Sequence, residues 1–199
     1  MRLFFVILAY FLGSIPFGLF VARAVKGIDI REHGSKNIGA TNVFRVVGKK
    51  WGLLVFLLDG LKGSAAVFIP LLLNASFKET PWPLFFGISA ILGHAFSPWL
   101  SFKGGKGVAT SLGVFLTAAP IPAGITFGLW LLVFGISHII SLASLFAALA
   151  FPMVCLFTAA GSPLFPYLFP VSFLLLGFIF YTHRTNLQRL LRGEEKKLF

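Results

Sequence analysis

The sequence has 199 residues, of which 57% are hydrophobic and only 12% are charged. Because soluble globular domains carry about 25% charged residues, this composition excludes that class and indicates a membrane protein with short loops. Lys and Arg outnumber Asp and Glu by 17 to 6, a net charge of +11, and the cations flank apolar runs. We therefore expect membrane lipids and anionic substrates as partners, and no nucleic acid.

The apolar runs predict an all-α polytopic membrane protein with one transmembrane domain over residues 1–199. Five runs are single spans, at residues 3–24, 51–74, 81–97, 139–160 and 163–181. Gly and Pro at residues 13–18 predict a kink or a close helix contact in the first span. The run at residues 107–135 is interrupted by Ala119-Pro-Ile-Pro122. It is either one kinked span or two short spans of about 14 residues, fewer than the roughly 20 that a bilayer requires.

The distribution of cations decides between these two interpretations. With two short spans, fourteen cations lie on one side of the membrane, against only Arg2 and Lys78 on the other. One kinked span would instead move the five cations of the C-terminal tail to the opposite side. The positive-inside rule therefore favours seven transmembrane helices, two of them short, with the N-terminus outside and the C-terminus in the cytoplasm. The short fourth and fifth helices predict local membrane thinning or a recessed polar cavity.

The polar stretch at residues 34–45 lies between the first two spans and reads Gly-Ser-Lys-Asn-Ile-Gly-Ala-Thr-Asn-Val-Phe-Arg. It carries hydroxyl, amide and cationic donors but no acid, at Ser35, Lys36, Asn37, Thr41, Asn42 and Arg45. If its second half is helical, Asn37, Thr41 and Arg45 share one face. A surface made only of donors suits an oxyanion, and the fork of an arginine suits a phosphate. The alternative is a basic loop that only orients the protein in the membrane.

A second polar group, the glycine loop at residues 103–107, precedes the fourth span. At the start of a helix, Gly104, Gly105 and Gly107 would let main-chain N–H groups approach a phosphate, with Lys103 and Lys106 as counter-charges. The loop is not a Walker A motif, because a glycine stands where Ser or Thr would bind magnesium. The alternative is a glycine turn between two spans.

A third group lies at the cytoplasmic end of the last span, where His183 and Asn186 share a helix face. Taken alone, it is an ordinary basic helix end. His94, near the end of the third span, and Ser141, at the start of the sixth, could reach the same cytoplasmic cavity. Glu195 in the tail is expected to be exposed and to form a structural salt bridge.

Asp59 and Lys62 form an acid–base pair inside the second span. Charged residues in a membrane are costly and usually paired or functional. The pair is therefore either a structural ion pair or part of the site. No His has an Asp five residues after it, so the His–Asp motif of thioester-dependent acyltransferases is missing. With six acids and one cysteine, Cys155, neither a metal nor a cofactor is expected.

Several segments occur in an order that resembles the bacterial acyl-phosphate:glycerol-3-phosphate acyltransferase family. They are Gly13-Ser-Ile-Pro-Phe-Gly18, the polar stretch, Asp59-Gly-Leu-Lys-Gly63, Gly93-His-Ala-Phe-Ser-Pro98, Phe102-Lys-Gly-Gly-Lys-Gly107 and His183-x-x-Asn186. The resemblance covers essentially the whole chain. Its one departure is Lys36, where the family usually has glycine.

The resemblance implies an enzyme of the bacterial cytoplasmic (inner) membrane whose active site faces the cytoplasm. It would transfer a fatty acyl group from acyl phosphate to the C1 hydroxyl of sn-glycerol 3-phosphate, giving 1-acyl-glycerol 3-phosphate (lysophosphatidic acid). The functional positions of the family map to Ser35, Arg45, Gly104, Gly105, Gly107, His183, Asn186 and Glu195.

Together, the residues and the resemblance give a candidate site. Its catalytic members are Ser35, Arg45, Lys103, His183 and Asn186. Its substrate-binding members are Asn37, Thr41, Asn42, Gly104, Gly105, Lys106, Gly107, Ser141 and His94. An acyl phosphate has a good leaving group, so no covalent enzyme intermediate is needed. His183 or the donor's own phosphate would take the proton, and a site poor in bases favours the phosphate. The rival function is a transporter or channel for a small anionic metabolite.

Overall fold

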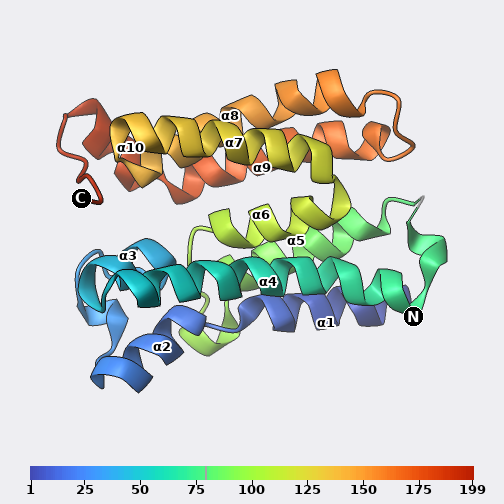
Figure 1. The fold of residues 1–199 in the computed structure, drawn as a ribbon. Coiled ribbons are helices and arrows are strands. Elements are labelled where there is room, and N and C mark those ends of the chain that lie inside the picture. Colours follow the sequence, from blue (N-terminus) through green and yellow to red (C-terminus); the bar gives the residue numbers. More distant parts are fainter. Residues whose placement is uncertain (79) are drawn as a thin grey trace.

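The computed structural model describes residues 1–78 and 80–199, which fold into helices joined by short connections (Figure 1). The α-helices are α1 (Arg2–Ser14), α2 (Phe17–Lys26), α3 (Ala40–Val46), α4 (Lys49–Leu73), α5 (Trp82–Ala95), α6 (Val108–Ala118), α7 (Pro120–Ser137), α8 (Ile140–Ala159), α9 (Phe165–Thr182) and α10 (Arg184–Leu191). Short 3-10 helices lie at Ile30–Glu32, Ala75–Phe77 and Pro98–Leu100. The described residues contain no strand, which confirms the all-α prediction.

Six helical segments of the described chain are long and apolar enough to cross a membrane. They are Arg2–Lys26, Lys49–Leu73, Trp82–Leu100, Pro120–Ser137, Ile140–Ala159 and Phe165–Thr182. Each corresponds to a predicted span. The first is broken between α1 and α2, at Ile15 and Pro16, where the kink was predicted.

The predicted division of residues 107–135 is present, but one predicted length is wrong. Helix α6 ends at Ala118 and α7 begins at Pro120, because proline fits the first turn of a helix, where its missing N–H has no partner to lose. With 11 residues, α6 is about 17 Å long, far less than the ~30 Å hydrocarbon layer. With 18 residues, α7 reaches about 27 Å and is not short. Of the two spans predicted to be short, only α6 is therefore short.

The helices form two packed groups. The N-terminal group pairs α1 with α5 and α4 with α6, and the C-terminal group packs α8 between α7 and α9 (Figure 1). The groups meet through α6 with α7 and through α5 with α9. A Cβ on Gly113 of α6 would lie 1.9 Å from the carbonyl oxygen of Gly60 in α4, so only glycine lets these helices approach so closely.

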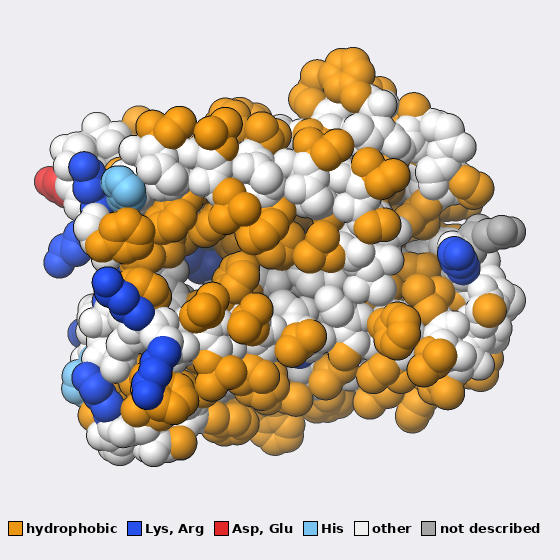
Figure 2. Space-filling view, in the orientation of Figure 1, with side chains coloured by type: hydrophobic (Ala, Val, Ile, Leu, Met, Phe, Trp, Pro, Cys, Tyr) orange, Lys and Arg blue, Asp and Glu red, His pale blue; other side chains and the backbone are white. Residues whose placement is uncertain are grey.

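The two ends of the bundle differ in character. Hydrophobic side chains cover most of its length, whereas Lys and Arg gather at the end that carries α2, α3 and α10 (Figure 2). This end is called the polar end below. The C-terminus lies at the polar end and the N-terminus at the opposite one (Figure 1).

Candidate functional site

A cavity of about 370 Å³ lies at the polar end, between the N-terminal and C-terminal groups. Figure 2 shows the surface hollowed there. Its polar lining comes from Ser35, Asn37, Thr41, Asn42, Arg45, Asp59, His94, Lys106, Ser141, Ser144, His183, Asn186, Arg189 and Glu195. The fold thus brings together all three polar groups predicted from the sequence, although the first ends at residue 45 and the third begins at residue 183.

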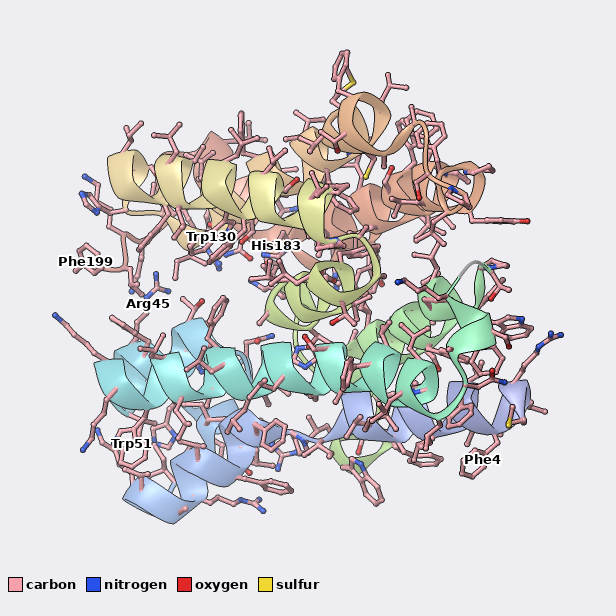
Figure 3. All side chains as sticks on the ribbon, turned by 45° about the vertical axis from the view of Figure 1, so that its right-hand side comes forward. Phe4, Arg45, Trp51, Trp130, His183 and Phe199 are labelled. Atoms are coloured by element: carbon pink, nitrogen blue, oxygen red, sulfur yellow. The ribbon has the colours of Figure 1, made fainter. Side chains whose placement is uncertain are left out.

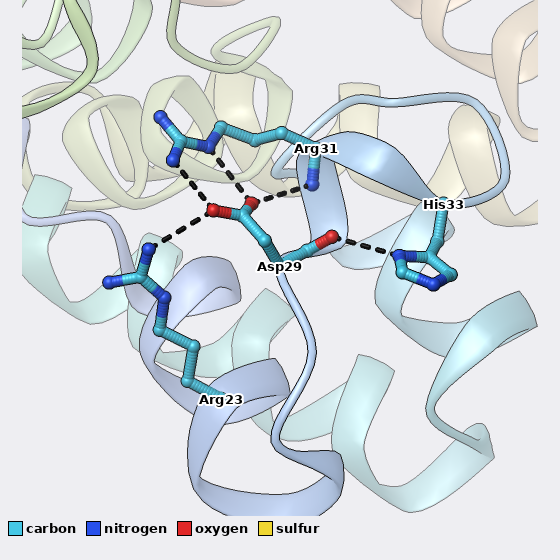
Figure 4. A network of polar contacts seen from close by, with 4 residues as sticks. All are labelled: Arg23, Asp29, Arg31 and His33. Atoms are coloured by element: carbon cyan, nitrogen blue, oxygen red, sulfur yellow. Dashed lines mark hydrogen bonds and ion pairs between the residues drawn. The ribbon is translucent and has the colours of Figure 1, made fainter.

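The connection that leads into the polar stretch is tied down by one carboxylate (Figure 4). Asp29 accepts hydrogen bonds from Arg31 at 2.6 and 2.9 Å and from Arg23 at 3.0 Å. The hydrogen bond from Arg31 is the main cause that holds the pKa of Asp29 well below its usual value. The main-chain oxygen of Asp29 also bonds the Nδ1 atom of His33, at 2.9 Å. This network fixes where the polar stretch begins.

Inside the polar stretch, Asn42 is the organising residue. Its Nδ2 donates to the main-chain oxygens of Asn37 at 2.8 Å and His33 at 3.0 Å, and its Oδ1 accepts from the Ser35 N–H at 2.9 Å. Both of its N–H groups are therefore committed to the protein. Asn42 lines the cavity with both donors committed, and its expected role in substrate binding stays a prediction. Lys36 has a left-handed φ of 59°, which explains why glycine suits this position.

Arg45 comes from α3 and reaches across the cavity mouth. Its Nη2 donates to the main-chain oxygens of Lys196 at 2.9 Å and Lys197 at 3.4 Å, and Figure 3 shows it directed toward the C-terminal group near Phe199. Because α3 begins at Ala40, only Thr41 and Arg45 of the predicted helical face are helical. Asn37 precedes the helix but still lines the cavity.

The glycine loop lies on the C-terminal end of α5. The Gly104 N–H donates to the Ala95 oxygen at 2.9 Å, and the Gly105 N–H donates to the His94 oxygen at 3.1 Å. These two N–H groups are therefore not free for a phosphate, contrary to the sequence expectation. Gly107 instead lines the cavity as the N-cap residue of α6, so the unpaired N–H groups and positive dipole end of that helix meet it.

The two lysines of the loop differ. The turn at Ser101 and Phe102, both with positive φ, leaves Lys103 exposed and outside the cavity lining, so its expected catalytic contact is not supported. Lys106 lines the cavity, and its Nζ donates to the side-chain oxygen of Asn186. Burial lowers the pKa of Lys106 to about 8, with the Glu195 carboxylate opposing the shift.

His183 ends α9 and is 3% exposed. Its Nδ1 lies 2.9 Å from the Ile179 main-chain oxygen, which can only accept, so Nδ1 carries the proton and Nε2 is an acceptor. Burial, followed by the charge of Lys106, lowers the pKa of His183 to about 4. In Figure 3 it lies with Trp130 on the side of the C-terminal group that faces α3 and α4. His183 is therefore neutral at pH 7.

Glu195 fastens the tail (residues 193–199) to the cavity. Its carboxylate accepts from Asn186 and Arg189 at 2.6 Å and from Ser141 at 2.8 Å. Burial opposes its ionisation, but these hydrogen bonds outweigh burial and lower its pKa. The predicted salt bridge is confirmed with Arg189, whereas the predicted exposure is wrong, because the Glu195 side chain is only 6% exposed. The hydroxyl of Ser141 is committed to this carboxylate.

Sequence reasoning did not identify the residues that form the apolar part of the site. A smaller pocket of about 80 Å³ shares Phe56, Val108, Phe127 and Trp130 with the cavity and continues between α6, α7, α8 and α9. The Nε1 of Trp130 donates to Ser144 Oγ at 3.1 Å, which fixes its indole. The spacing of aromatic residues at i, i+3 and i+7 from Phe127 was the available signal. A polar cavity that continues into an apolar pocket suits an amphiphile.

No group of three or more His, Cys, Asp or Glu side chains is placed to hold a metal ion within residues 1–78 and 80–199. The expectation that no metal or cofactor takes part stays a prediction.

Comparisons with known proteins agree with one another. A family model described as "Glycerol-3-phosphate acyltransferase" matches residues 3–193. Relatives of that name include one from Fusobacterium nucleatum, 46% identical over 97% of this chain and 96% of its own. Another from Aquifex aeolicus is 45% identical over 98% of both chains. Two crystal structures of PlsY (YgiH), an integral membrane glycerol 3-phosphate acyltransferase, have similar folds. Its glycerol 3-phosphate form has a TM-score of 0.89 and 41% identity, and its lysophosphatidic acid form 0.87 and 40%. Each match covers 98% of this chain and 94% of the other.

Proposed function

Because the chain belongs to the glycerol-3-phosphate acyltransferase family, it is a membrane enzyme that acylates glycerol 3-phosphate in phospholipid synthesis, and we propose that its donor is an acyl phosphate. The family sets aside the rival function, a transporter for a small anion. The product is 1-acyl-glycerol 3-phosphate, and the second product is inorganic phosphate.

One observation carries the proposal: donors from both helix groups surround a single cavity that continues into an apolar pocket. Arg45 and Lys106 both supply cations to the cavity, and the N-terminus of α6 adds its dipole. Two phosphates can be held here while the acyl chain enters the apolar pocket. Holding two reactants in this way can supply about 7–11 kcal/mol of the barrier.

Acyl transfer proceeds directly between the two bound substrates. The C1 hydroxyl oxygen attacks the acyl carbon, a new ester bond forms, and the bond between that carbon and the phosphate oxygen breaks. Arg45 stabilises the charge on the leaving phosphate, whereas Lys106 and the start of α6 hold the phosphate of glycerol 3-phosphate. The proton of the hydroxyl goes to an oxygen of that phosphate. The low pKa of His183 supports this route, because a group with a pKa of about 4 is a weak base at pH 7.

We further propose seven crossings of a bacterial inner membrane, with α6 as the short crossing and the polar end in the cytoplasm. The clustering of cations at the polar end and the opposite positions of the two termini support this orientation. Ser35 and Asn37 then face the cytoplasmic supply of glycerol 3-phosphate.

The test compares two donors that carry the same acyl chain. Purified protein in detergent is incubated with labelled glycerol 3-phosphate and either palmitoyl phosphate or palmitoyl-CoA, and labelled lysophosphatidic acid is quantified. We expect product with palmitoyl phosphate only, and none from an Arg45→Ala preparation purified in parallel, which controls for contaminating acyltransferases. Comparable turnover with palmitoyl-CoA would overturn the proposed donor.

A further inference from the structure

A buried charge network on α4 and α5 borders the cavity, whose lining includes two of its members, Asp59 and His94. Lys62 and Asp59 form an ion pair of 2.7 Å, and their side chains are only 2% and 4% exposed. Breaking such a pair is costly, yet replacing both members by apolar residues is often neutral or stabilising. Stability alone is therefore a weak reason to keep two charges in this position.

One end of the network holds the break in the first span. The Nζ of Lys62 donates to the Ile15 main-chain oxygen at 2.7 Å and lies 5.6 Å from the centre of the Phe17 ring. Ile15 is the C-cap residue of α1, and Pro16, which follows, has no N–H to donate. Lys62 thus ties α4 to the junction between α1 and α2.

The other end of the network lies against the glycine loop. The Nδ1 of His94 is 3.7 Å from Asp59 Oδ1, and its side chain is 5% exposed. A Cβ on Gly105 would lie 2.1 Å from His94 Nε2 and one on Gly104 would lie 2.0 Å from the His94 main-chain oxygen. The Gly105 N–H also donates to that oxygen. The imidazole is therefore the surface on which the loop lies.

We propose that Asp59, Lys62 and His94 are positioning residues. They set how far the glycine loop lies from the end of α5, and so place Lys106 and the start of α6 against the substrate phosphate. The chain of contacts runs from the ion pair to the His94 ring, then to the Gly105 main chain, and Lys106 follows in sequence. None of the three needs to touch substrate. The ring nitrogen that could do so, Nε2, faces Gly105 instead. This inference rests on the proposed function in one respect: it assumes that a substrate phosphate binds beside the glycine loop.

The first test adds a side chain to the loop at Gly105 and removes the ring of His94 that the added side chain would meet. Gly105→Ala pushes a methyl group into His94, so the loop shifts and the KM for glycerol 3-phosphate rises by about 10-fold or more, as for a lost charged hydrogen bond. His94→Ala removes the ring and leaves room for that methyl group. We expect the double variant to bind glycerol 3-phosphate better than Gly105→Ala alone, with a coupling of at least about 5-fold, within the range of contacting residues. The proposal would be overturned if the KM of the double variant rose by the product of the two single-variant factors, because the two substitutions would then act independently.

The second test separates positioning from a purely structural ion pair. In the double variant Asp59→Asn/Lys62→Met both charges are gone, so no unpaired charge remains buried. We expect a thermal midpoint near that of the wild type but a KM for glycerol 3-phosphate raised about 10-fold with little change in kcat, which is the mark of lost binding. A normal KM in a folded protein would overturn the proposal. If this variant does not fold, the exchange at Gly105 and His94 decides, because it keeps both charges.

A matched control and a second readout keep the two proposals apart. Ser64→Ala removes a partly buried hydrogen bond of 2.9 Å from α4 to the Gly113 oxygen in α6, away from the cavity lining, and should leave KM unchanged. Stabilisation of each protein by glycerol 3-phosphate in a thermal shift assay needs no donor. It therefore reports the loop position even if acyl phosphate is not the donor. If the wild-type protein does not turn over palmitoyl phosphate, the proposed donor is contradicted, but the positioning network is not.

Discussion

Replacing His183 by Ala separates the two possible roles of its ring. The Nδ1–H donates to Ile179, so Nε2 is an acceptor that can receive a hydrogen bond from a glycerol hydroxyl. Substitution by Ala removes that acceptor and leaves the rest of the cavity lining in place. We expect weaker binding of glycerol 3-phosphate rather than loss of the chemical step.

The structure gives the size of the effect. The pKa of His183, about 4, lies three units below pH 7, so protonating the ring there costs about 4 kcal/mol. A neutral hydrogen bond contributes about 0.5–1.5 kcal/mol, which corresponds to a rise in KM of about 2- to 12-fold. Loss of a general base would instead lower kcat by about 10²–10⁴. The two outcomes do not overlap.

Steady-state kinetics with palmitoyl phosphate and varied glycerol 3-phosphate provide the assay. Lys49→Ala is the control, since this side chain is exposed and lies outside the cavity lining, and its kinetics should equal those of the wild type. A fall of 10²–10⁴ in kcat for His183→Ala, with KM unchanged, would refute the substrate-assisted route.

Three further predictions concern the cations. Arg45→Lys keeps the positive charge but loses the two-pronged guanidinium. The value of kcat/KM should therefore fall about 10- to 150-fold, which corresponds to the free energy of a charged hydrogen bond. Near-normal kinetics would mean that Arg45 serves only to orient the protein in the membrane. Lys106 loses its proton above its pKa of about 8, so the KM for glycerol 3-phosphate should rise above that pH, and Lys106→Arg should move this limb to higher pH. If the KM of the Lys106→Arg variant rises at the same pH as that of the wild type, the rise is caused by a group other than Lys106. Single cysteines in place of Lys78 and Lys196 should label from opposite sides of the membrane, and labelling from the same side is incompatible with seven crossings.

The spans could be predicted because the signals that set them are local. Apolar length defined each helix, and Pro120 marked the start of α7 because proline is favoured in the first turn of a helix. The length of α7 was misjudged because the apolar run was divided into equal halves, whereas α6 ends at Ala118 and α7 continues to Ser137, where His138 is a left-handed C-cap.

The composition of the site was predictable, but the role of each polar group was not. Asn42, Gly105 and Ser141 all belong to the site, yet each donates its hydrogen bonds to other groups of the protein. Those partners come from distant parts of the chain or from the folded path of a loop. Glu195 was read as exposed because its neighbours in sequence are charged, whereas the fold surrounds it with three donors. Hydrogen-bond partners of this kind follow from tertiary structure alone.

Direct transfer between two bound substrates can be tested by isotope exchange. Purified protein is incubated with palmitoyl phosphate and radiolabelled inorganic phosphate, with and without glycerol 3-phosphate. Without the acceptor, a direct mechanism leaves the acyl group on its phosphate, so no label should enter palmitoyl phosphate, while lysophosphatidic acid forms once the acceptor is added. Exchange of label in the absence of glycerol 3-phosphate would require an acyl-enzyme intermediate and would contradict direct transfer.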